Sequence, residues 1–151
     1  MKHALLAGIL TLLATLTAEA RIGETPQEIT ARYGEGRKSN DRLKVSGAET
    51  RTYSKAGFTI EVVFLGDKSI WEIIQREGTA ITDEDIKGLL KLYDTPATNW
   101  RLDRKEIRWE RGGKPKLVAY RWPGHPDFFC IKDIEACDTA EKKAKPGASG
   151  L

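Results

Sequence analysis

Residues 58–75 read FTIEVVFLGDKSIWEIIQ, and this stretch decides the fold class. Apolar side chains recur at every second position from Phe58 to Phe64, which is the period of a β-strand. Gly66-Asp67 has the form of a tight turn, and a second apolar run follows from Ser69 to Gln75. The stretch therefore predicts an antiparallel β-hairpin.

A two-residue turn fixes the register of such a hairpin. In this register Val62 faces Trp71 on one side of the sheet, and Glu61 faces Glu72 on the other side. The first side is fully apolar and the second is mixed, so we expect a helix to pack on the first and solvent to reach part of the second.

Two helices are predicted by capping boxes, in which a threonine is followed three residues later by an acid. Thr25-Pro26-Gln27-Glu28 begins a helix that reaches Tyr33, and Thr82-Asp83-Glu84-Asp85 begins one that reaches Tyr93. Both starts read Thr-x-x-acid-Ile. They indicate either an internal repeat of a helix-plus-hairpin unit or two common capping boxes that are alike by chance.

A second β region follows, with strands expected from Glu106 to Glu110, Lys116 to Trp122 and Phe128 to Lys132. The sequence thus predicts an α+β fold with two short helices packed on antiparallel β-sheet. If the repeat is real, two helix-plus-hairpin repeats share one sheet. The expected organisation is a signal peptide at 1–20, one domain at 21–138 with half-repeats at 22–77 and 80–133, and a disordered tail at 139–151.

The first twenty residues have the three zones of a secretory signal. Lys2 carries a positive charge, Ala4 to Leu16 is apolar, and Ala18-Glu19-Ala20 supplies small residues for the peptidase. The apolar run falls short of the roughly 20 residues that span a bilayer. We therefore predict cleavage after Ala20, no stable membrane insertion of the mature chain, and a periplasmic or secreted location.

Cys130 and Cys137 are the only cysteines. In an oxidising compartment such a pair is more often a bridge than two free thiols, so a disulfide is expected. No metal site is predicted, because two thiols without a nearby histidine make an incomplete zinc site. Their spacing also differs from the C-x-x-C of a redox motif.

The first half resembles small exported bacterial proteins of the SmpA/OmlA type. The residues that carry the resemblance are Gly23-x-Thr25-x-x-Glu28-Ile29, Gly34, and the run from Tyr53 through Gly57-Phe58 to Phe64, about half of the mature chain. The resemblance implies a non-catalytic envelope component with a helix pair on an antiparallel sheet. The doubled form resembles the β-lactamase-inhibitor-protein fold. The chain departs from the family because it lacks a lipidated cysteine and has a second β unit.

The candidate binding residues lie in the second β region, where Trp109, Tyr120 and Trp122 crowd beside Arg108 and Arg121. Aromatic faces next to guanidinium groups suit sugars or an acidic protein surface. The alternative is that Trp109 and its neighbours form the core of this region, with the arginines lying over the rings from outside.

No catalytic motif is present, and we predict no catalytic residue, no enzyme activity and no cofactor. A net charge of +3 is too small for a nucleic-acid footprint. The predicted function is an exported binding module for an unknown extracytoplasmic protein or an anionic glycan. The alternatives are a glycan-binding module and a hydrolase acting on an envelope polymer, with Glu61 and Glu72 as its carboxylates.

The export prediction is tested by the intact mass of the chain recovered from the extracytoplasmic fraction. We expect a mass that begins at Arg21, because the peptidase would cut after Ala20. A full-length mass in the membrane fraction would contradict this.

Overall fold

The computed structural model describes residues 22–39, 45–95, 97–104 and 107–144. The predicted signal peptide at 1–20 and the last residues, 145–151, lie outside the described part. The helices are α1 (Pro26–Tyr33), α2 (Asp83–Lys91) and α3 (Ile134–Ala144). The strands are β1 (Arg37–Lys38), β2 (Ala48–Lys55), β3 (Phe58–Leu65), β4 (Lys68–Arg76), β5 (Trp100–Asp103), β6 (Arg108–Arg111), β7 (Leu117–Arg121) and β8 (Phe128–Asp133).

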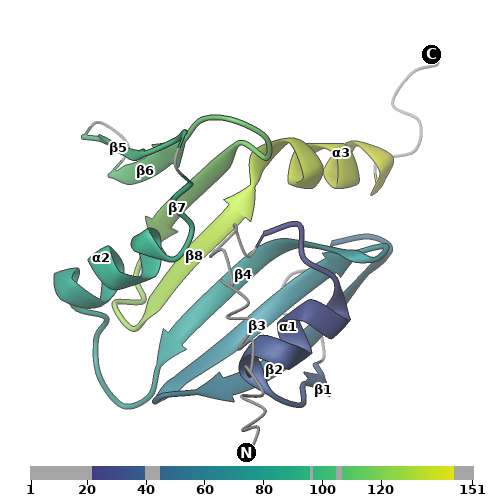
Figure 1. The fold of residues 1–151 in the computed structure, drawn as a ribbon, viewed down its shortest axis with the longest axis horizontal. Coiled ribbons are helices and arrows are strands. Elements are labelled where there is room, and N and C mark those ends of the chain that lie inside the picture. Colours follow the sequence, from purple (N-terminus) through teal and green to yellow (C-terminus); the bar gives the residue numbers. More distant parts are fainter. Residues whose placement is uncertain (1–21, 40–44, 96, 105–106, 145–151) are drawn as a thin grey trace, which may run out of the picture.

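All eight strands form one antiparallel sheet in the order β1-β2-β3-β4-β8-β7-β6-β5 (Figure 1). The two halves of the sheet have mirrored strand orders. From the edge to the centre, one half runs β1 to β4 and the other runs β5 to β8, and each begins with a short edge strand. The halves meet where β4 pairs with β8, two strands that are far apart in the sequence.

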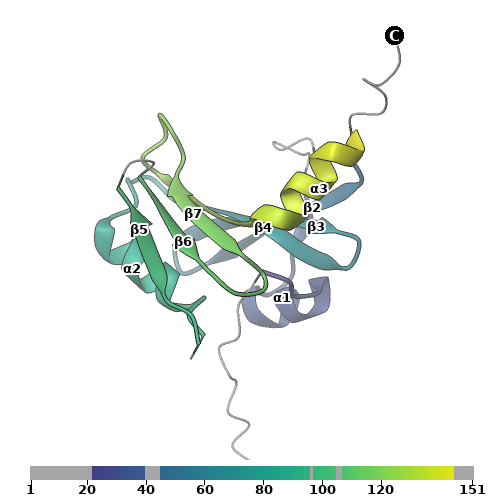
Figure 2. The same cartoon turned by 90° about the horizontal axis from the view of Figure 1, so that it is seen from above.

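The two faces of the sheet are covered differently (Figure 2). Helices α1 and α2 lie on one side, which we call the α1/α2 face, and Ile29, Ile86 and Leu90 bury their side chains there. Helix α3 lies on the other side, the α3 face, and places Cys137 against β4 and β8. Figure 2 shows α3 toward β2, β3 and β4, so that β6 and β7 carry no helix on this face.

The predicted fold class was wrong in its proportions: the protein is mainly an eight-stranded antiparallel sheet, and the described residues form three helices rather than two. Strand β2, from Ala48 to Lys55, was not among the predicted strands. Its side chains are mostly polar, so no apolar alternation marks it, and it is held by its pairing with β3.

The predicted disordered tail was also wrong as far as Ala144. Helix α3 continues through residues that looked too polar and too small to fold. Its Cys137 and Ala140 are buried, with 3% and 1% of their surface exposed. Packing against the α3 face thus stabilises a helix that its composition alone does not predict.

Both predicted capping boxes are confirmed. Thr25 N–H donates to Glu28 Oε2 at 2.7 Å, and Thr82 N–H donates to Asp85 Oδ2 at 2.8 Å. The threonine hydroxyl of each box accepts the N–H of the acid in return. These contacts satisfy donors at the helix start that have no partner within the helix.

The predicted register of the β3–β4 hairpin is correct only next to its turn. Leu65 pairs with Lys68 and Phe64 with Ser69, as expected, but Val63 pairs with Trp71, which leaves Ile70 as an extra residue. Such an extra residue is a β-bulge. From Trp71 onward, each side chain of β4 therefore points to the face opposite to the one predicted.

The segment that precedes α1 pairs with β4 at this bulge. Gly23 N–H donates to the carbonyl oxygen of Ser69 at 2.8 Å, and Ser69 N–H donates to the carbonyl of Glu24 at 2.8 Å. The Ser69 hydroxyl also accepts from Gly23 N–H at 3.0 Å. Beyond the bulge β4 pairs with β8 instead, so the bulge lies where β4 changes its partner on that edge.

The bulge turns Glu72 toward the α1/α2 face, where it is fully buried. Its Oε2 accepts a hydrogen bond from the Tyr93 hydroxyl at 2.7 Å and another from the Tyr33 hydroxyl at 3.2 Å. Tyr33 ends α1, and Tyr93 follows α2. One carboxylate on a central strand thus joins the helices of both halves.

Replacing either tyrosine tests this junction. We expect Tyr93→Phe and Tyr33→Phe each to lower the free energy of unfolding by about 1–3 kcal/mol, with the larger loss for Tyr93, because a buried carboxylate loses a donor. Urea denaturation with an unchanged m-value measures the loss. In a Glu72→Leu background Tyr93→Phe should cost little. Equal losses in both backgrounds would contradict the coupling.

Candidate functional site

Strand alternation divides the five candidate binding residues between the two faces of the sheet. Arg108 pairs with Tyr120 across β6 and β7, and both lie on the α3 face, as does Trp122 at the end of β7. Trp109 belongs to the core of the α1/α2 face and contacts the Phe129 ring edge-on at a centroid distance of 5.8 Å. The structure therefore brings Arg108, Tyr120 and Trp122 together on one face and places Trp109 on the other.

Arg121 is held at the start of α2. Its guanidinium donates to the carbonyl of Ile81 at 2.5 Å and to Asp83 Oδ1 at 2.6 Å. The same side chain contributes to the wall of the groove described next, but these contacts give it a structural partner.

A groove of about 740 Å³ lies over β6, β7 and β8 on the α3 face. Tyr120 on β7 and Trp122 just after it line the groove, with Lys132 from β8 and Ile107 just before β6. The groove exists because α3 lies toward the other half of the sheet and leaves this part of the face uncovered (Figure 2).

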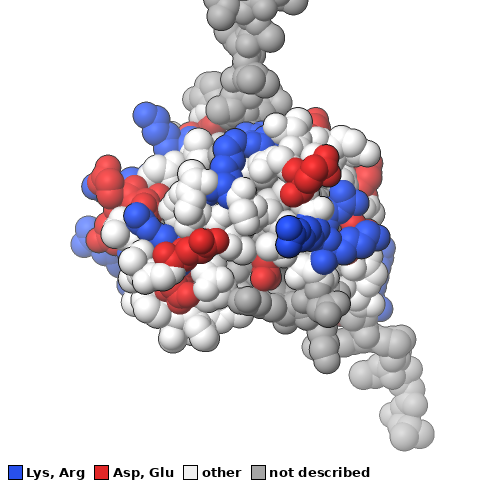
Figure 3. All heavy atoms as spheres, turned by 90° about the horizontal axis from the view of Figure 1, so that it is seen from below, with Lys and Arg blue, Asp and Glu red and all other residues white. Residues whose placement is uncertain are grey.

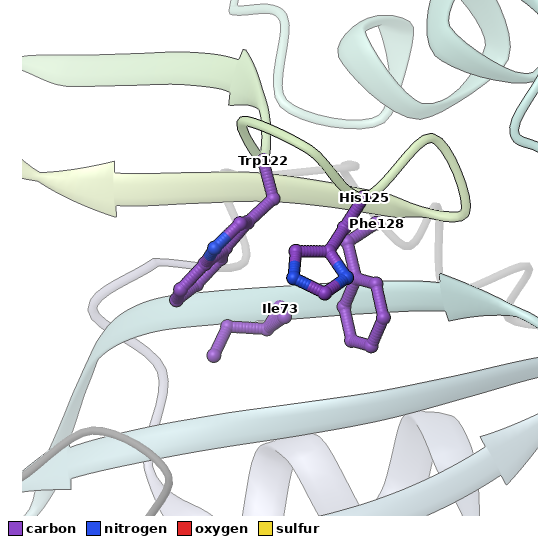
Figure 4. A pocket seen from close by; sticks show the side chains of 4 residues that line it. All are labelled: Ile73, Trp122, His125 and Phe128. Carbon is purple, nitrogen blue, oxygen red and sulfur yellow. The ribbon is translucent and has the colours of Figure 1, made fainter.

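A smaller pocket of about 160 Å³ opens beside the groove and shares Trp122 and His125 with it. Figure 4 shows the Trp122 indole and the His125 ring on either side, with Phe128 behind His125 and Ile73 beneath them. We call this pocket the slot. Its walls are aromatic and its floor is an aliphatic side chain, so it favours an apolar group.

The β7–β8 turn builds the slot. Trp122 N–H donates to the carbonyl of Phe128 at 3.2 Å and closes the hairpin, while His125 N–H donates back to the carbonyl of Trp122 at 3.1 Å. Gly124 has a φ of 76°, a left-handed conformation that glycine adopts without steric cost. This turn brings His125 over the sheet, edge-on to Phe128 at 5.7 Å. No motif in the sequence marks His125 as a site residue.

The groove is electrostatically positive. Its lining includes Arg108, Arg121 and Lys132 and, among the residues that the structure describes, no aspartate or glutamate. On the face drawn in Figure 3, in contrast, Lys and Arg alternate with Asp and Glu. Arg108 forms an ion pair with Glu110, with 2.6 Å between Nη2 and Oε1. Lys132 Nζ lies over the Trp71 ring, 4.9 Å from its centroid, where the ring face attracts a cation.

The two cysteines lie on the same face, and the structure differs here from the sequence-based expectation: they are free thiols. The Cys137 sulfur points to the carbonyl of Ile70, 3.9 Å away, whereas Cys130 is placed beside Trp71 and Tyr120. Burial raises the pKa of Cys130 to about 12 and that of Cys137 to about 11. Few thiolates are therefore available to form a disulfide.

The carboxylate pair that a hydrolase would need is not assembled. Glu61 pairs with Ile73 and lies on the α3 face, whereas Glu72 pairs with Val62 on the α1/α2 face. The bulge at Ile70 separates them, because a shift of one residue moves every later side chain to the other side of the sheet. Across the described residues, no group of three His, Cys, Asp or Glu side chains could hold a metal ion.

Comparisons with protein-family models, with curated proteins and with solved structures give no match. The SmpA/OmlA resemblance therefore stays a prediction. Of the helices in the described ranges, none is long and apolar enough to cross a membrane.

The state of the cysteines is tested by alkylation with iodoacetamide at pH 8, followed by intact-mass measurement. We expect the folded chain to react slowly, because burial holds both thiol pKa values far above that pH, and the urea-unfolded chain to gain two adducts quickly. Rapid reaction of the folded chain would contradict the burial. An unfolded chain that gains adducts only after reduction would reveal a bridge.

Proposed function

We propose that this chain is an exported, non-catalytic binding protein that holds a macromolecular partner in the groove on its α3 face. The observation that carries the proposal is the convergence of Tyr120, Trp122 and Lys132 on one uncovered part of the sheet. Tryptophan and tyrosine in a concave site are among the residues that contribute most to binding energy at interfaces, and Lys132 adds a positive charge beside them.

The separation of Glu61 from Glu72 favours binding over hydrolysis, because glycoside hydrolysis in its common form needs two carboxyl groups that flank one bond. The site also lies on β7, which pairs with β6 on one side and with β8 on the other, so backbone hydrogen bonds fix its position. A rigid, preformed site loses little conformational entropy when a partner binds. Export follows from the three-zone leader at 1–20 and remains part of the proposal.

Site-specific photo-crosslinking in the producing cells tests the proposal. With p-benzoylphenylalanine in place of Tyr120, we expect a discrete adduct with one extracytoplasmic macromolecule, identified by mass spectrometry. The matched control is the same group at Lys87, an exposed position on α2. Because Lys87 lies on the opposite face, it should give no such adduct. Equal patterns from both positions, or none from Tyr120, would contradict the proposal.

A further inference from the structure

A strained residue marks one rim of the groove. Ile107 has a φ of 52° and is 69% exposed. A β-branched residue is rarely found in this left-handed region, and such strain is concentrated at functional sites. The backbone thus holds an aliphatic side chain in solvent at the edge of the groove, where it contacts whatever enters.

The slot offers a second apolar contact beside the groove, at the β7–β8 turn. Trp122 and Phe128 are 6.5 Å apart between ring centroids, and the Ile73 side chain closes the bottom. Its volume of about 160 Å³ suits one aliphatic side chain. Neither Ile73 nor Ile107 has a side-chain group that could bond a sugar hydroxyl, so the two apolar contacts disfavour a glycan.

Lys132 supplies a positive charge to the same groove, where β8 pairs with Val118 of β7. Its ammonium group lies above the rings of Trp71 and Tyr120, at 4.9 and 6.0 Å from their centroids. No carboxylate of the described residues lies within ion-pair distance of it. An anionic group in the groove would therefore meet a cation that the fold already holds in place.

From these three features we infer that the groove takes an acidic segment of a protein partner, which inserts one aliphatic side chain into the slot between Trp122 and His125 and packs against Ile107. This inference rests on the proposed function and names the chemistry of its partner. Apolar anchors beside a positive charge distinguish such a segment from a purely anionic polymer.

The test is selection of a phage-displayed library of random 12-residue peptides on the immobilised mature chain. We expect the enriched peptides to share one aliphatic residue flanked by Asp and Glu. A synthetic peptide with that consensus should bind in solution, and replacing its aliphatic residue by serine should weaken binding about tenfold, since the slot would be left empty.

Three variants locate the binding site. Lys132→Glu should weaken the consensus peptide about tenfold or more, because a cation becomes an anion at the contact. The matched control, Lys91→Glu on α2, makes the same charge change on the opposite side of the sheet and should leave affinity unchanged. Ile107→Gly should weaken binding while the melting temperature stays or rises, because glycine relieves the strained backbone. A variant that binds weakly only because it is unfolded would also show a lower melting temperature.

A basic or uncharged consensus, or an acidic one that binds Lys132→Glu and Lys91→Glu equally, would overturn the inference. So would the absence of enriched peptides together with binding of polygalacturonate, which would assign the groove to an anionic glycan. A Tyr120 adduct in cells without an acidic consensus would reject this inference alone. Absence of that adduct would reject the proposed function itself.

Discussion

The buried carboxylate of Glu72 is the constraint on which the arrangement of both halves depends. A fully buried carboxyl group is costly unless it is hydrogen-bonded, and here one oxygen accepts from tyrosines at the ends of two helices. The helices cannot slide along the sheet without losing these bonds. Glu72 therefore sets where α1 and α2 lie, and hence which face of the sheet stays free of them.

The bulge at Ile70 determines this geometry and also places Trp71 on the α3 face. Without it, Trp71 would point to the helices and Glu72 to the other side, as the simple hairpin register requires. With it, Ile70 and Trp71 both contribute to the α3 face. Trp71 then stacks with Trp122 at 6.4 Å and lies under Lys132, so the local irregularity in β4 supports the wall of the groove.

Local signals in the sequence predicted the parts of the fold that local contacts determine. The Thr25 and Thr82 capping boxes and the Gly66-Asp67 turn could be read because their partners lie a few residues away. The bulge could not, because it lies where Ser69 pairs with the segment at Gly23, which is far away in the sequence. Alternation along β7 separates Tyr120 from Arg121, but His125 joins the slot only through the folded turn.

The pairing of β4 with β8 has a kinetic meaning as well. These central strands are separated by residues 77–127, so they can pair only after this long segment has been brought back to the sheet. Until β8 arrives, the inner edge of β4 presents unpaired backbone groups and an apolar surface that can pair with other chains. A polypeptide made from its N-terminus carries this open edge from the completion of β4 until β8 has been made, and during that interval the edge is exposed to pairing with other chains.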